Sequence, residues 1–194
     1  GWVSSTSVRG QYSLGGKPGG MMLTGQYGFD NDFVDFSGSF VGQGGVTLPR
    51  TDDTWNAFWN GWQYLSVEEQ SDKPIDIADG RADRQGYGLF ARCAVADRDT
   101  NPVDFVASGG LAGRGMFAGR DEDSFGIGYG FADIHEQAFL TGNVIDDTGS
   151  RIEAYYSLAL TPAVELSFHA QHADPILASV DASTILGFRL RMQF

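Results

Sequence analysis

The sequence predicts an all-β fold, an antiparallel transmembrane β-barrel, on three observations. The chain has 27 glycines and 13% aromatic residues in 194 positions, and glycine weakens helix interiors whereas aromatic side chains favour strands. Apolar and polar residues alternate with a period of two along about nine segments, as they do in strands with one apolar face. These segments are about ten residues long, which suits tilted strands that cross a membrane.

The closing segment, TILGFRLRMQF, shows the alternation most clearly. In an extended strand its apolar side chains share one face: Leu186, Phe188, Leu190, Met192 and Phe194. Contact with lipid explains this face, because hydrocarbon takes the place of a protein core, and an arginine there costs about 2 to 4 kcal/mol at the membrane midplane. We therefore expect Arg189 and Arg191, on the opposite face, to point into a water-filled lumen.

The same parity assigns charged residues of earlier segments to the lumen. Charged wall residues are one means by which pores bias what passes. The sequence thus predicts seven candidate pore-lining residues: Arg92, Asp104, Arg114, Glu165, His169, Arg189 and Arg191. For each arginine the alternative is an ordinary solvated wall residue without a role in selectivity.

The connections between segments are expected to alternate between short and long, with the charged stretch 68–84 as an exception. A transmembrane barrel predicts this alternation, because its turns are short on one side of the membrane and its loops long on the other. Residues 31–53 are longer than most connections in compact domains, which indicates a functional loop. Whether this loop enters the pore or covers it stays open.

Composition and charge exclude several kinds of function. A net charge of -12 without a basic run argues against nucleic acid as a partner. Cys93 is the single cysteine and has apolar parity, so the chain forms no internal disulfide and no cysteine-based zinc cluster. The mean hydropathy of -0.20 and the absence of a run of about eighteen apolar residues argue against a transmembrane helix.

No residue pattern predicts an enzyme, a metal site or a cofactor. Glu165, Ser167 and His169 share a face, but neighbours two apart on a strand lie about 7 Å apart, too far for a Ser to His hydrogen bond. His169 and His172 are three apart, so they point to opposite faces and do not bind one metal ion. Asp121–Asp123 lacks the spacing of a calcium loop and is expected to be a solvated turn.

Several stretches resemble the carbohydrate-selective porin family of the bacterial outer membrane, the OprB type. They are GGMMLTGQYGFDNDF, GLFARCAVADRDTNPVDFVASGGLAGRGMFAGRDEDSFGIGYGFADI, EAYYSLALTPAVELSFHAQHADP and TILGFRLRMQF. The resemblance implies a sixteen-stranded barrel that lets sugars diffuse passively into the periplasm, with outer-membrane lipid around it. Residues 1–194 would form a single partial barrel domain, the C-terminal part of a longer porin, and the odd number of strands agrees with this.

The resemblance also bears on assembly and on selectivity. Phe194 resembles the terminal signal by which the barrel-assembly machinery recognises such proteins. The family's sugar-selecting constriction is built largely by segments N-terminal to this fragment, so its binding residues are not carried over. The preferred sugar and the choice between monomer and trimer therefore stay open.

Three other interpretations remain. A general or ion-conducting porin would have the same fold. A soluble β-sandwich, a lectin-like carbohydrate-binding module, would instead bury Leu186 and Phe188 in a core. A barrel enzyme or an autotransporter domain is a weaker alternative, since an enzyme would need a catalytic constellation near the outer rim and the sequence shows none.

Overall fold

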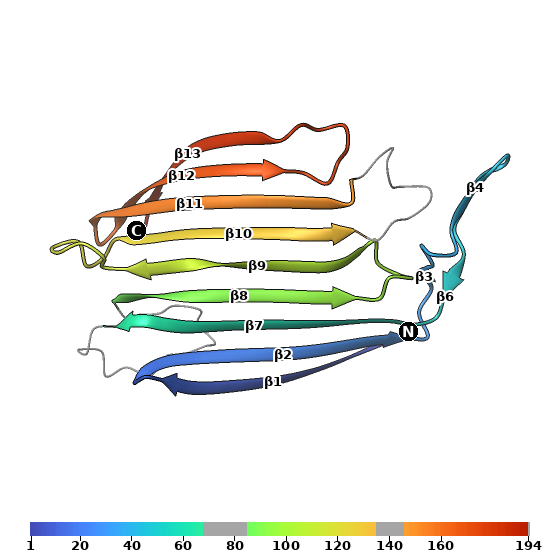
Figure 1. The fold of residues 1–194 in the computed structure, drawn as a ribbon, viewed down its shortest axis with the longest axis horizontal. Coiled ribbons are helices and arrows are strands. Elements are labelled where there is room, and N and C mark those ends of the chain that lie inside the picture. The colour runs from blue at the N-terminus through green and yellow to red at the C-terminus, as the bar shows by residue number, and fades with distance from the viewer. Residues whose placement is uncertain (68–84, 135–145, 194) are drawn as a thin grey trace.

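One antiparallel sheet makes up most of the protein. The computed structural model describes residues 1–67, 85–134 and 146–193, and in these ranges nine strands pair in the order β1-β2-β7-β8-β9-β10-β11-β12-β13 (Figure 1). Their bounds are β1 Trp2–Leu14, β2 Lys17–Phe29, β7 Thr54–Val67, β8 Gly86–Ala96, β9 Val103–Arg114, β10 Ser124–Ile134, β11 Thr148–Thr161, β12 Val164–Asp174 and β13 Ser183–Met192. The predicted all-β, antiparallel fold with about nine strands is confirmed, and the sheet is open, with β1 and β13 at its edges.

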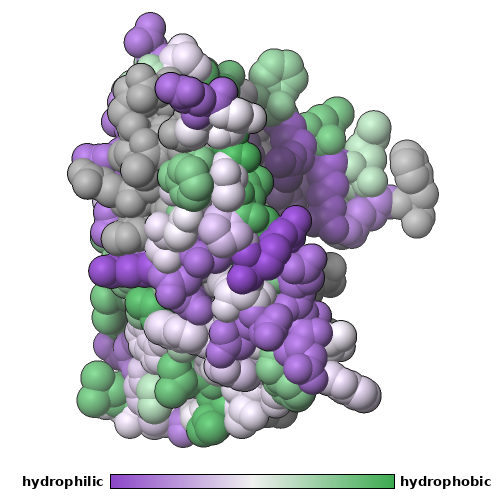
Figure 2. All heavy atoms as spheres, turned by 90° about the vertical axis from the view of Figure 1, so that its right-hand side faces the viewer, coloured by the Kyte–Doolittle hydropathy of each residue, from purple (hydrophilic) through white to green (hydrophobic). Residues whose placement is uncertain are grey.

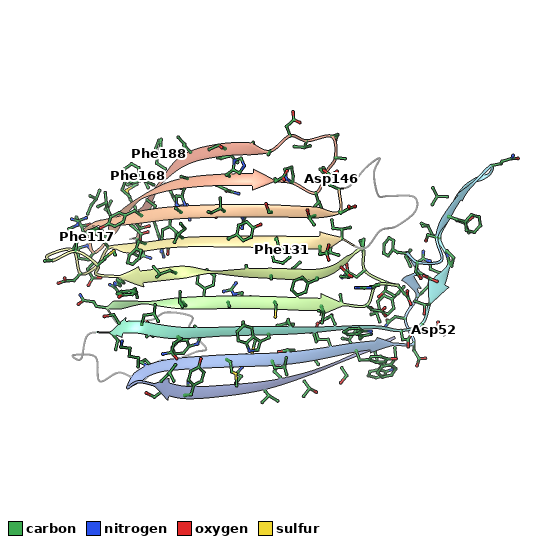
Figure 3. All side chains as sticks on the ribbon, in the orientation of Figure 1. Asp52, Phe117, Phe131, Asp146, Phe168 and Phe188 are labelled. Carbon is green, nitrogen blue, oxygen red and sulfur yellow. The ribbon has the colours of Figure 1, made fainter. Side chains whose placement is uncertain are left out.

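The pairing of residues between strands defines two distinct faces that run across the whole sheet. Residues directly opposite each other in neighbouring strands share a face. The outer face is defined here by the opposed residues Phe125, Tyr156, Phe168 and Phe188. The inner face is defined by Ser124, Ser157, Ser167 and Arg189, which are opposed in the same strands. Figure 3 shows where Phe131, Phe168 and Phe188 leave β10, β12 and β13.

No layer built from the described residues covers the apolar outer face. Leu186 and Phe188 are 78% and 79% exposed, and Tyr64 and Ile134 are the buried large apolar side chains of the described residues. A β-sandwich would cover such a face with a second sheet. The exposure therefore argues against the soluble β-sandwich.

Connections at the two ends of the sheet differ in character. Residues 15–16, 115–123 and 162–163 lie at one end, called the turn end, and residues 30–53, 97–102 and 175–182 lie at the other, called the loop end. The predicted alternation holds only in part, because 115–123 is longer than 97–102. The stretch 68–84 and the predicted assembly signal Phe194 lie outside the described residues.

The long connection 31–53 has strand structure of its own. It contains two short ladders: β3 (Phe33–Val34) with β6 (Arg50–Thr51), and β4 (Phe40–Gly42) with β5 (Gly45–Thr47). The backbone N–H of Phe36 donates to the carbonyl of Asp99 at 2.6 Å, which ties this connection to residues 97–102. The loop projects past the loop end of the sheet (Figure 1), and Figure 2 shows hydrophilic side chains over much of that end.

Residues 115–123 form a connection called the clasp here, in which Asp121 and Glu122 are exposed as expected for a solvated turn but Asp123 is buried. The Asp123 carboxylate is 3% exposed and accepts hydrogen bonds from Arg120 Nε (2.7 Å) and Nη2 (2.9 Å), from the Tyr156 hydroxyl (2.8 Å) and from the Ala159 N–H (2.9 Å). Ala159 lies two residues past the last β10–β11 pair, Ser124 with Ser157. The side chain thus replaces a strand carbonyl there, which a tighter turn would not allow.

The clasp also reaches the outer face. Phe117 belongs to the 115–123 connection rather than to β9, and its ring lies 6.0 Å from that of Tyr156. Gly115 and Gly119 have φ of 70° and 76°, in the left-handed region that glycine adopts without strain. The described residues contain no helix of the length and apolarity needed to cross a membrane.

The Asp123 carboxylate makes the stability of the folded protein depend on pH in the acid range. Burial would raise the pKa of Asp123, but the hydrogen bonds from Arg120, Tyr156 and Ala159 outweigh it and lower the pKa from its usual 3.8. The stability contributed by the charged carboxylate is therefore present above about pH 4 and lost as the pH falls through the folded-state pKa. We expect Asp123→Asn to lower the urea midpoint of the refolded full-length protein at pH 7, and the difference from wild type to shrink as the pH falls from about 5 toward 2.

Asp121→Asn is the matched control for this prediction. Asp121 lies in the same connection and is exposed, so this substitution should leave the midpoint close to that of wild type at pH 7. An Asp123→Asn protein as stable as Asp121→Asn at pH 7 would contradict the role given to the clasp.

Candidate functional site

Six of the seven predicted wall residues lie on the inner face. The register places Arg92 opposite Ser108, Arg114 opposite Ser124 and Glu165 opposite Arg191. The remaining two, Arg189 and His169, lie opposite Ser167 and Tyr155. The register thus places these six residues on one face of the sheet, and that this face lines a pore stays a prediction.

Asp104, the seventh residue, lies in an irregularity of the sheet. Phe105 opposes Asp133 and Val103 opposes Ile134, so Asp104 has no residue opposite it. Its side chain is 6% exposed, and Oδ2 lies 2.6 Å from Nε of Arg98. The other oxygen, Oδ1, is buried without a hydrogen bond in the described structure. Asp104 is therefore held at the loop end by Arg98 rather than exposed on the wall.

Three hollows follow one another along the inner face. The first, of about 840 Å³, is lined by Phe58, Asn60 and Gln171 together with Arg92 and Arg151. The middle hollow, of about 400 Å³, shares both arginines and adds Phe90, Glu153 and Tyr155. The third, of about 720 Å³, lies at the turn end among Arg114, Glu122, Glu165 and Arg191. Together the hollows form a concave path from the loop end to the turn end, lined by both polar and apolar side chains.

The charges along this path are mixed rather than purely positive. Arg114 Nη2 forms an ion pair with Glu122 Oε2, and Arg191 stands opposite Glu165. Ser167 donates to Glu165 Oε1 at 3.2 Å and shares a hydrogen bond of 2.7 Å with Ser157. The inner face therefore offers hydrogen-bond donors and acceptors side by side, which suits a neutral, hydroxyl-rich solute as well as ions.

The contacts of His169 do not assemble a catalytic group. Its Nδ1 lies 3.3 Å from Glu153 Oε1, and its ring stacks on Tyr155 with centroids 5.8 Å apart. The Ser167 hydroxyl instead contacts Ser157 and Glu165, in line with the distance argument from the sequence. The Ser167 and His169 side chains therefore form no catalytic pair in the described structure.

The structure also shows where His172 and Cys93 lie, two residues for which the sequence predicted no metal site. His172 lies on the face opposite to His169 and hydrogen-bonds Thr184 at 2.9 Å. Cys93 lies on the outer face between Trp59 and Ala107. The described residues contain no group of three or more His, Cys, Asp or Glu side chains that would hold a metal ion.

Phe90 and Tyr155, which the register places on the inner face, were not among the candidate residues predicted from the sequence. Their signal was the run of alternating glycines in β10. A methyl group at Gly126 would come within 2.5 Å of Cε1 of Tyr155, and one at Gly128 within 3.3 Å of Cζ of Phe90. The two rings therefore lie over glycines of β10, which the pattern alone did not reveal.

Comparison with known proteins identifies the relatives of this sheet. A family model described as "Carbohydrate-selective porin, OprB family" matches residues 3–194. The fold is similar to the "High pH structure of Pseudomonas putida OprB", with a TM-score of 0.78 and 18% identity over 99% of this chain and 48% of that chain. The chain thus spans about half the length of that protein, and the likeness shows the fold. A comparison with curated proteins gives no match.

The glycines of the inner face allow a direct test. A Cβ at Gly110 would overlap the carbonyl oxygen of Ile127 and lie 2.7 Å from Cα of Gly128, so the backbone would have to move. We expect Gly110→Ala to lower the free energy of unfolding of the full-length protein by about 1 to 3 kcal/mol, measured by urea titration. Gly25→Ala is the control, because a Cβ at Gly25 meets nothing within 4 Å. Equal stability of the two variants would refute the close packing at Gly110.

Proposed function

Because the chain belongs to the OprB family of carbohydrate-selective porins, we propose that it forms part of the wall of an outer-membrane channel through which sugars diffuse passively. Its single partial barrel domain would join further strands of a longer protein. The observation that carries the proposal is the two-faced sheet, apolar and uncovered outside, polar and hollowed inside.

The outer face supports contact with the lipid of the bacterial outer membrane. Leu186, Phe188 and Phe168 are exposed on it, and in hydrocarbon such side chains cost nothing to expose. Backbone groups in hydrocarbon need internal partners, which the continuous ladders between neighbouring strands supply. Recognition of Phe194 by the barrel-assembly machinery is part of the same proposal.

The inner face supports transport without covalent chemistry. A sugar that leaves water must replace the hydrogen bonds of its hydroxyl groups, and Arg92, Arg151 and Glu153 offer replacements along the wall. Conduction requires sites that bind a solute well enough to admit it and weakly enough to release it. Successive hollows that share Arg92 and Arg151 provide neighbouring sites of this kind.

A general or ion-conducting porin is the second candidate. The observation in its favour is the charge on the inner face, where Arg92, Arg189 and Arg191 lie near water. Charged rings bias ion passage whether or not sugars bind. Only the response of the open channel to a sugar separates the two functions.

Single-channel conductance in a planar bilayer tests the proposal. The full-length protein is refolded in detergent, and D-glucose is titrated against the ionic current. We expect discrete current steps that glucose reduces saturably, because a bound sugar occupies the ion path. Steps that ignore glucose would favour the general porin, and a protein that folds in plain buffer without insertion would overturn the membrane assignment.

Two adjacent residues of β12 test which face meets lipid. Ala170 lies on the outer face opposite Leu186, and Gln171 lies on the inner face opposite Ile185. We expect Ala170→Arg to reduce the free energy of folding into lipid vesicles by about 2 to 4 kcal/mol, since the charge enters hydrocarbon. Gln171→Arg should cost much less, because its charge stays in water. Similar losses for both variants would contradict the assignment of the faces.

A further inference from the structure

Two glycines and two aromatic side chains on either side of them line the middle hollow of the inner face. Gly126 and Gly128 of β10 form the floor, Phe90 of β8 lies on one side, and Tyr155 of β11 lies on the other. Phe90 reaches across β9, since a methyl group at Gly110 would come within 3.0 Å of its Cε1 and one at Gly128 within 3.3 Å of its Cζ. Two strands that are not neighbours thus supply rings to one hollow.

The Tyr155 ring is fixed from behind. His169, directly opposite on β12, stacks on it at an interplanar angle of 24°, and Glu153 Oε1 lies 3.3 Å from Nδ1 of that histidine. One edge of the Tyr155 ring lies against Gly126, where an added methyl group would come within 2.5 Å of Cε1. A ring packed on one face by His169 and at one edge by Gly126 loses little freedom when a ligand arrives, and such preorganisation favours binding.

Polar groups border the same hollow. Arg92, Arg151 and Glu153 line it together with the rings, so a ligand meets apolar surfaces and charged hydrogen-bonding groups at once. Sites for small molecules combine apolar lining with a few polar groups in this way, and their volumes of about 300 to 1,000 Å³ include the 400 Å³ found here.

A pyranose ring has matching chemistry. Its C–H groups form flat apolar faces that rest on the electron-rich face of an aromatic ring, and its rim of hydroxyl groups accepts from arginine and donates to carboxylate. We propose that Phe90, Tyr155, Arg92, Arg151 and Glu153 form a subsite for one pyranose ring of a sugar in transit. The inference rests on the proposed function and adds to it a binding station on the β8–β11 wall.

Channel block by two solutes tests the subsite in the full-length protein. D-Glucose has the flat ring faces, whereas mannitol has similar hydroxyl groups on an open chain. We expect Phe90→Leu and Tyr155→Leu to raise the half-blocking concentration of glucose about fivefold and to leave that of mannitol unchanged. Tyr155→Phe keeps the ring and should stay within about twofold of wild type.

Controls and contrary outcomes are specific. Tyr129→Leu removes a tyrosine ring from the outer face of β10 and should leave glucose block unchanged, and Phe90→Met replaces Phe90→Leu if the latter does not insert. If glucose blocks the Phe90→Leu and Tyr155→Leu channels at the same half-blocking concentration as the wild-type channel, the subsite is overturned and the proposed function is left intact. A wild-type channel that glucose does not block would overturn both.

Discussion

Lateral backbone hydrogen bonding between strands is the constraint on which the rest of this structure depends. Each interior strand of the sheet pairs with two neighbours in antiparallel register. Because opposed residues share a face, the register fixes which residues of each strand, from β1 to β13, lie on the outer face and which on the inner face. A slip of one residue in any pair would move apolar side chains to the inner face and arginines to the outer face. The apolar outer face and the hollows of the inner face therefore require the same register.

Packing on the inner face depends on pairing large rings with residues that lack side chains. Phe90 lies over Gly110 and Gly128, Tyr155 lies over Gly126, and Trp62 of β7 lies against Gly20 of β2 in the same manner. A ring can approach the neighbouring strand closely where that strand has glycine, whereas a Cβ at the same position would push the ring away. The glycines thus create both the close packing of the wall and its hollows.

Where the backbone ladder ends or is interrupted, the carboxylate of an aspartate forms the hydrogen bond or ion pair that holds the chain there. Asp123 accepts the N–H of Ala159 beyond the end of β10, and Asp104 occupies the irregularity at the start of β9, where it pairs with Arg98. Buried carboxylates are costly unless they are paired and hydrogen-bonded. Both sites therefore fix a connection to the sheet, one at each end, and neither has the exposed position expected from the sequence.

The sequence by itself determined the all-β fold, the number of strands and the face of nearly every wall residue, because the period of two is a local property of an extended chain. It placed Arg92, Arg189 and Arg191 correctly for that reason. Only the tertiary structure decided the burial of Asp104 and Asp123 and the placing of Phe90 and Tyr155 around one hollow. These depend on an irregular register, on connections that fold back, and on contacts between strands that are not neighbours, none of which alternation along one strand encodes.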